Sequence, residues 1–171
     1  MPINYKKVMY MKTSRKLLAC GLFLLFVITM TGCAAGEDKL NLFDDDTRIA
    51  QEGDSYTFVN RVGLDGSYSA NQVNFKYGGF SGIQTIWMLD VNEDTAVTID
   101  VNSRVESGEF KAVLVTPTKR VKTVISGDQQ VLKSLSLIPG KYAFKVAGHN
   151  ANGQVKISIQ PGQAVTVEKV E

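Results

Sequence analysis

Three side chains of this sequence could take part in thiol or imidazole chemistry, and they are Cys20, Cys33 and His149. A structural zinc site needs four ligands of the cysteine or histidine type, so the chain cannot build one from these residues alone. Both cysteines lie near the N-terminus and the histidine lies far from them in sequence. Any role of the two thiols must therefore be sought in the N-terminal segment.

Residues 1–32 have the pattern of a secretory signal peptide. They hold five cations and no Asp or Glu, and an apolar run over residues 17–30 follows Lys16 directly. This run has 14 residues, fewer than the roughly 20 that cross a bilayer as a helix. Cations, a short apolar segment and then small residues are typical of a cleaved signal. We expect a signal-peptide helix here, starting at Met1 or at Met11; an uncleaved membrane anchor is the alternative.

The residues Met30-Thr31-Gly32-Cys33 resemble a lipobox, the processing motif of bacterial lipoproteins. A lipobox usually reads Leu-Ala/Ser-Gly/Ala-Cys, and Met30 stands in place of the Leu. The resemblance implies that Cys33 receives a thioether-linked diacylglycerol, with acyl chains of the palmitate kind, and that cleavage falls before it. Two acyl chains give stable anchoring. It predicts a lipoprotein on the extracytoplasmic side of the cell membrane; an ordinary signal peptide with a chance cysteine is the alternative.

Cleavage before Cys33 would change the charge of the protein. The whole chain has a formal net charge of +2, whereas residues 33–171 hold 14 cations and 17 anions, which gives −3. Nucleic acid is therefore a disfavoured partner. Cys20 would leave with the signal peptide and Cys33 would become a thioether, so we expect no disulfide and a fold that depends on its hydrophobic core.

Residues 33–54 are rich in acidic side chains, with seven Asp or Glu among 22 positions. The run Asp44-Asp45-Asp46 invites a calcium interpretation, but a calcium loop of the EF-hand kind needs Gly at its sixth position, where this chain has Ile49. Like charges keep a segment extended. We therefore interpret residues 33–54 as a solvated acidic tether.

From residue 55 onward, apolar and polar residues alternate with a period of two, which predicts half-buried strands. No convincing helical period occurs there, and turn signals fall between the strands at short spacing. Asn152-Gly153 in particular suits a two-residue hairpin turn. We expect residues 55–171 to form an all-β, antiparallel, jelly-roll-like β-sandwich of eight to ten short strands. The other turn signals are at residues 65–66, 78–79, 92–94, 107–108, 126–128, 139–140 and 161–162.

Three segments of this predicted sandwich, residues 77–87, 107–115 and 137–148, carry a Gly-Phe-Ser-Gly stretch, a Ser-Gly-Glu-Phe-Lys strand and a Leu-Ile-Pro-Gly-Lys-Tyr hairpin. Together they resemble a group of small lipoproteins of Gram-positive bacteria. The last hairpin is also similar to the pre-peptidase C-terminal type of jelly roll. These motifs are structural, so the resemblance implies a fold and a location but no active site and no cofactor.

The chain offers little that is typical of an enzyme. Ser81 lacks the Gly two residues later that a nucleophile elbow requires, and His149 lies in a predicted turn. A glycosidase needs two carboxylates across one cleft, and sequence alone cannot pair any two of the available acids. We therefore expect no catalytic, metal or cofactor site, with a carboxylate-pair hydrolase as the third choice of function. The acids considered are Asp90, Glu93, Asp94, Asp100, Glu106 and Glu109.

Four aromatic residues lie within 20 positions, at Tyr68, Tyr77, Phe80 and Trp87. Exposed Trp and Tyr rings serve sugar-binding sandwiches as stacking platforms. However, residues 86–89 are apolar on both faces of their predicted strand, which favours core packing of Trp87. The sequence thus predicts a membrane-anchored, non-catalytic module that binds an unidentified protein or glycan at the cell envelope. A carbohydrate-binding domain that uses the four aromatics is the second choice.

Overall fold

The computed structural model describes residues 42–64 and 69–170. They belong to a compact unit that starts at Glu37. The predicted signal peptide and Cys33 lie outside the described residues, and within the described ranges no helix has the length and hydropathy to span a bilayer. The elements are α3 (Asp46–Ile49), β1 (Ser55–Thr57), β2 (Asn60–Gly63), β3 (Gln72–Val91), β4 (Thr95–Val115), β5 (Val121–Ser126), β6 (Gln129–Leu137), β7 (Gly140–Gln160) and β8 (Val165–Lys169).

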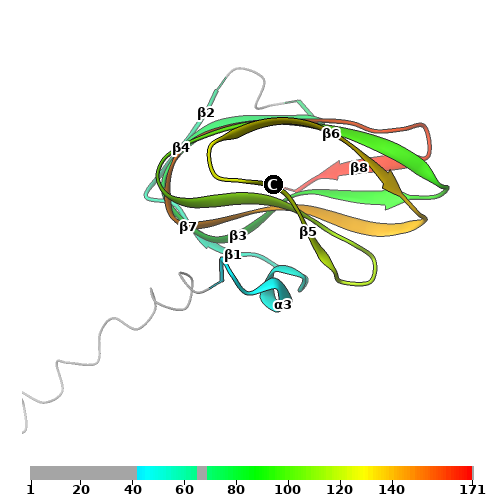
Figure 1. Ribbon diagram of the computed structural model, residues 1–171, viewed down its shortest axis with the longest axis horizontal. Coiled ribbons are helices and arrows are strands. Elements are labelled where there is room, and N and C mark those ends of the chain that lie inside the picture. Colours follow the sequence, from blue (N-terminus) through cyan, green and yellow to red (C-terminus); the bar gives the residue numbers. More distant parts are fainter. Residues whose placement is uncertain (1–41, 65–68, 171) are drawn as a thin grey trace, which may run out of the picture. The chain divides into compact units, whose positions relative to one another are not determined.

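All strand pairs are antiparallel, and they run in the order β1-β3-β7-β4-β5, with β2 and β8 also paired to β3 and β6 to β4. β3, β7 and β4 have 20 or 21 residues each and bend midway, so each contributes to both layers of a β-sandwich (Figure 1). The predicted all-β antiparallel sandwich is confirmed. It has eight strands in the described ranges, but three of them are long where short strands were expected.

We call the two layers A and B. Layer A contains β2 and β6 together with residues 72–77 of β3, 95–105 of β4 and 153–160 of β7. Layer B contains β1, β5 and β8 together with residues 83–91 of β3, 110–115 of β4 and 140–148 of β7.

The main core lies between the layers and is filled by the alternating apolar residues of both. Trp87 has no exposed surface and packs on Phe144, and its indole Nε1 donates a hydrogen bond of 2.8 Å to the carbonyl of Ala70. Buried indole N–H groups need such a partner. The predicted core packing of Trp87 is therefore confirmed.

Three of the predicted turns are bends inside long strands. The Asn152-Gly153 hairpin is wrong, because Gly153 continues the ladder of β7 and pairs with Tyr77 on one side and Val105 on the other. Oδ1 of Asn152 accepts a hydrogen bond of 3.0 Å from the backbone amide of Gly79. Nδ2 of the same side chain donates one of 2.9 Å to Ser107 Oγ. The side chain of Asn152, which was expected in a turn, thus joins β7 to β3 and β4 where the three strands bend.

The signals at residues 78–79 and 107–108 also fall inside strands, β3 and β4. Gly108 has a φ of +73°, and a Cβ there would collide with the carbonyl of Asn150 in β7. Only glycine combines this backbone conformation with so close an approach. By contrast, the signals at residues 92–94, 126–128, 139–140 and 161–162 lie where strands connect, as expected.

Gly127 and Gly108 have nearly the same φ, but only Gly108 is crowded. Comparing alanine substitutions at the two therefore separates the free-energy cost of a positive φ from that of a steric clash. Gly127, in the β5–β6 turn, has a φ of +76° and open space around its missing Cβ. We expect Gly127→Ala to lower the free energy of unfolding by about 1 kcal/mol. Gly108→Ala should lower it by about 2 kcal/mol more, because its Cβ also meets backbone. Urea denaturation followed by the emission of Trp87 measures both, and equal losses would contradict the close approach at the bend.

Candidate functional site: a groove beside an N-terminal strap

The outer face of layer B is covered by residues 42–54, which we call the strap. Figure 1 shows α3 of this segment outside the sandwich, and Ile49 of α3 packs on the layer B parts of β3 and β7. The interpretation of residues 33–54 as a solvated tether is therefore wrong for residues 42–54, and residues 33–41 lie outside the described ranges. Buried strap residues Leu42, Phe43, Ile49 and Ala50 cluster with Ile83, Val113, Val115, Ala143 and Ala147 of the sheet.

The acidic run that suggested a tether has a local structural role. Asp45 is the N-cap of α3, and its carboxylate accepts a hydrogen bond of 3.1 Å from the amide of Arg48. Asp46 lies in the first turn, where a negative charge is favourable. These acids are exposed, whereas Ile49 on the other side of the turn has no exposed surface. The run thus starts an amphipathic turn that docks on the sheet.

Lys145 of β7 fastens the end of the strap to layer B. Its ammonium donates a hydrogen bond of 2.8 Å to the carbonyl of Gln51 and one of 3.4 Å to that of Gly53. It also lies 3.8 Å from a carboxylate oxygen of Asp54, and only 3% of its side chain is exposed. A buried ammonium is stable only with such partners, so this lysine requires the strap in its docked position.

Asp54 is held from its other side by Thr85, which pairs with Lys145 across β3 and β7. One carboxylate oxygen accepts from the Thr85 amide at 2.7 Å and the other from its hydroxyl at 2.6 Å. Burial lowers the pKa of Lys145 from its ordinary value, and the negative charge of Asp54 opposes that effect. The three residues form one polar network on the sheet face beneath the strap.

A hollow of about 500 Å³ lies between residues 50–54 of the strap and the sheet. Its volume is in the range of small-molecule sites, about 300–1,000 Å³. Apolar side chains of three strands and of Val170, the last residue that the structure describes, line it, and charged side chains line its rim. The apolar residues are Met88, Val115, Ala143 and Val170, and the charged ones are Glu52, Asp54, Lys119, Lys141 and Lys145.

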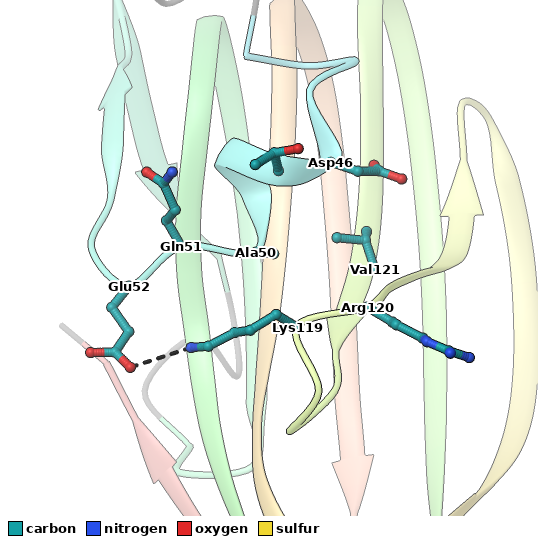
Figure 2. Close-up of a pocket in the computed structure, with 8 residues that line it drawn as sticks. Asp46, Ala50, Gln51, Glu52, Lys119, Arg120 and Val121 are labelled. Atoms are coloured by element: carbon teal, nitrogen blue, oxygen red, sulfur yellow. Dashed lines mark hydrogen bonds and ion pairs between the residues drawn. The ribbon is translucent and has the colours of Figure 1, made fainter.

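A second hollow, of about 790 Å³, lies between α3 and the β4–β5 turn and shares residues 50–52 and Lys119 with the first. Figure 2 shows Lys119 reaching from that turn to Glu52 of the strap, with 3.3 Å between the charged groups. Both side chains are more than half exposed. We call the two connected hollows the strap groove; this ion pair bridges its two parts.

A third hollow, of about 470 Å³, lies on the outer face of layer A. Its lining is almost entirely polar and has no apolar floor. The strap groove is the better-formed candidate, because small-molecule sites combine an apolar lining with a few convergent polar groups. The third hollow is lined by Asn102, Ser103, Arg104, Asp128, Gln129, Gln130, Gln154 and Lys156.

Three of the predicted ligand residues are described by the structure, and none of the three lies at the surface. Cys33 and Tyr68 lie outside the described residues. Phe80 and Trp87 have no exposed surface and Tyr77 is 3% exposed, since all three fill the core between the layers. Burial also raises the pKa of the Tyr77 hydroxyl. None of these three rings offers a face on which a sugar could stack.

His149 and Glu109 form an exposed pair, with 3.1 Å between Nδ1 of the imidazole and a carboxylate oxygen. The nearby Ser81 hydroxyl accepts instead from the amide of Asn150, so the structure shows no hydrogen bond from this hydroxyl to the imidazole. The six acids considered for a hydrolase are all exposed, and none lines the three hollows described above. Within the described residues, no three His, Cys, Asp or Glu side chains gather to hold a metal ion.

Sequence reasoning missed the strap groove, although two signals pointed to it. Asp45 followed by Ile49 and Ala50 is a capped amphipathic turn, which a solvated tether would not need. The run Ala112-Val113-Leu114-Val115 is apolar on both faces of β4, so its outer face also needs a cover. Nothing in the sequence shows that the cover comes from the N-terminal side.

The chain was compared with known families, curated proteins and solved structures. No family model matches it, and no curated protein does. A solved structure of a family 35 carbohydrate-binding module from an environmental isolate shares 10% identity with it. The alignment covers 67% of this chain and 83% of that one, with a TM-score of 0.33. A similarity at this level says nothing about the ligand of this chain.

Lys145→Met removes the charge that holds the strap. We expect it to lower the free energy of unfolding by about 3 kcal/mol, because Asp54 and two strap carbonyls lose a buried partner. Lys156→Met, at an exposed position of layer A, is the matched control and should change it by less than about 0.5 kcal/mol. Urea denaturation measures both. Equal effects would show that Lys145 does not fasten the strap.

The lowered pKa of Lys145 also predicts a pH dependence. Between this pKa and the unfolded value of 10.5, the unfolded chain holds more protons than the folded one. The free energy of unfolding therefore gains a contribution from Lys145 as pH rises through that window. The stability difference between the wild type and Lys145→Met should widen from neutral pH toward pH 10.5. Urea midpoints of both proteins test this, and a constant or narrowing difference would contradict it.

Proposed function

We propose that this protein is a lipoprotein anchored through Cys33 on the extracytoplasmic side of the membrane, and that its β-sandwich is a non-catalytic binding module. The cationic start, the short apolar run and the residues Met30-Thr31-Gly32-Cys33 support the anchor. An anchored domain needs no activity of its own to act, since it can hold a ligand or partner at the membrane.

Covalent geometry adds a limit to this proposal. Eight residues, 34–41, separate Cys33 from Leu42, the first strap residue that the structure describes on the sheet. A chain spans at most about 3.5 Å per residue, so an anchor at Cys33 would keep Leu42 within about 30 Å of the lipidated thiol. The domain would therefore act on molecules at or near the membrane surface.

The observation that carries the binding proposal is the strap groove. Its first hollow, of about 500 Å³, combines an apolar floor with a charged rim, as small-molecule sites do. Both carboxylates of that rim are already engaged, Glu52 with Lys119 and Asp54 with Lys145 and Thr85. Both carboxylates that line the first hollow thus have protein partners, whereas a carboxylate-pair hydrolase needs two that act on its substrate.

Carbohydrate binding stays the second candidate, on one observation of layer A. The hollow there presents the carboxamides of Asn102, Gln129, Gln130 and Gln154. Carboxamides both donate and accept hydrogen bonds, as sugar hydroxyls do. This version of the proposal uses no aromatic platform.

The two cysteines provide a matched test of the anchor. Cys33→Ala should abolish incorporation of a labelled lipid precursor and leave the uncleaved chain, because only the thiol at the end of the motif is acylated. Cys20→Ala should be labelled and processed as the wild type is, because Cys20 lies within the expected signal peptide. Labelling in intact cells and gel mobility measure both outcomes. Labelling of Cys33→Ala would overturn the proposed anchor.

A further inference from the structure

We infer that the strap groove binds a small anionic amphiphile, a molecule with an apolar chain and one carboxylate. Its chain would lie on the apolar floor, and its carboxylate between Lys119 and Lys141 at the rim. The inference names a ligand class for the binding module proposed above, and it rests on that proposal only for the location of the module.

The floor fits a flexible apolar chain. Val115 and Ala143 are buried in the sheet face, and Met88 and Val170 are only half buried beside the hollow. Methionine adapts its shape to irregular apolar partners. The strap packs its own apolar residues on this sheet face, Val115 and Ala143 included, and leaves Met88 and Val170 half exposed at the edge of its cover. An apolar chain would complete that cover.

The charges at the rim favour an anion. Lys119, Lys141 and Lys145 face Glu52 and Asp54 around the groove, which leaves one positive charge in excess. Lys145 is fully used by Asp54 and the strap carbonyls, so it holds the strap and not a ligand. Lys119 and Lys141 are therefore the two lysines that remain to pair with a ligand carboxylate.

Lys119 is available at little cost, because its only ion pair in the described residues is with Glu52, whose side chain is 92% exposed. An exposed pair of this kind contributes little to stability, so a ligand carboxylate can replace Glu52. Lys141 is exposed and lies opposite Asp90 in the β3–β7 register, yet no ion pair of 4.0 Å or less joins these two described residues. Both lysines line the same hollow, which is why we place the ligand carboxylate between them.

The direct test compares decanoate with decanol, at concentrations below micelle formation, by isothermal titration calorimetry. The protein used is the full chain, and the variants below separate binding in the groove from binding elsewhere. We expect decanoate to bind saturably and about tenfold more tightly than decanol, because only decanoate can pair with the lysines. Absence of saturable decanoate binding would overturn the inference.

Charge-matched variants show where the carboxylate lies. Lys119→Gln with Lys141→Gln should raise the Kd of decanoate about tenfold and leave that of decanol unchanged. Lys76→Gln with Lys133→Gln makes the same charge change at exposed positions of layer A that line none of the three hollows and should leave both unchanged. If both double variants weaken decanoate binding equally, the overall charge of the protein explains the effect, and the placement of the carboxylate at the rim is overturned.

Two further variants test the floor. Ala143→Leu fills the groove from β7 and should abolish binding of both probes, with thermal denaturation to confirm that it folds. If it does not fold, Val170→Glu decides, since this half-buried side chain near the C-terminus lines the groove and its charge would repel decanoate alone. Unchanged decanoate affinity in Val170→Glu would overturn the inference.

The results remain distinguishable from those on the anchor. If Cys33 is lipidated and decanoate does not bind, the ligand class is wrong and the anchored module stands. If decanoate binds but Cys33 is not lipidated, the groove assignment stands and the proposed location is wrong.

Discussion

The backbone pairing of β3, β7 and β4 through both layers is the constraint on which the rest of the structure depends. Because the three strands are hydrogen-bonded side by side over most of their lengths, they must bend together, and their register shifts at the bend. Gly108 and Asn150 adopt positive φ there, +73° and +49°, and the side chain of Asn152 bonds to β3 and β4. Without this shared bend the two layers could not enclose one core.

Folding long strands over makes the two outer faces unequal. Layer A presents polar side chains outward, for example Asn102, Gln154 and Lys156. Layer B presents apolar side chains outward, and their exposure to water would be unfavourable. The strap supplies the missing cover, and two lysines are buried beneath it. Lys145, at 2% exposure, is satisfied by strap carbonyls and Asp54, and the ammonium of Lys111, at 9% exposure, lies 4.6 Å from the centre of the Phe43 ring. The strap thus supplies both the apolar residues that cover layer B and the polar partners of Lys145.

The groove follows from this arrangement, because the strap is too short to cover layer B completely. Its last residues arch from Ala50 to Asp54 and leave an apolar hollow with a charged rim. In the proposed anchored protein, the same segment leads back toward Cys33. The candidate site and the candidate anchor would therefore be joined by a chain of a few residues, which suits a module that holds amphiphilic molecules near a membrane.

The sequence by itself determined the fold class, since the period of two and most turn signals follow from local side-chain and backbone preferences. It also determined that Trp87 is a core residue, because its strand is apolar on both faces. Only the tertiary structure decided that Asn152-Gly153 bends a strand instead of closing a hairpin, because cross-strand partners override a local turn preference. It also decided that the strap, residues 42–54, docks on layer B. The apolar strap residues pack on sheet residues that lie up to about a hundred positions away, and the local sequence carries no record of such contacts.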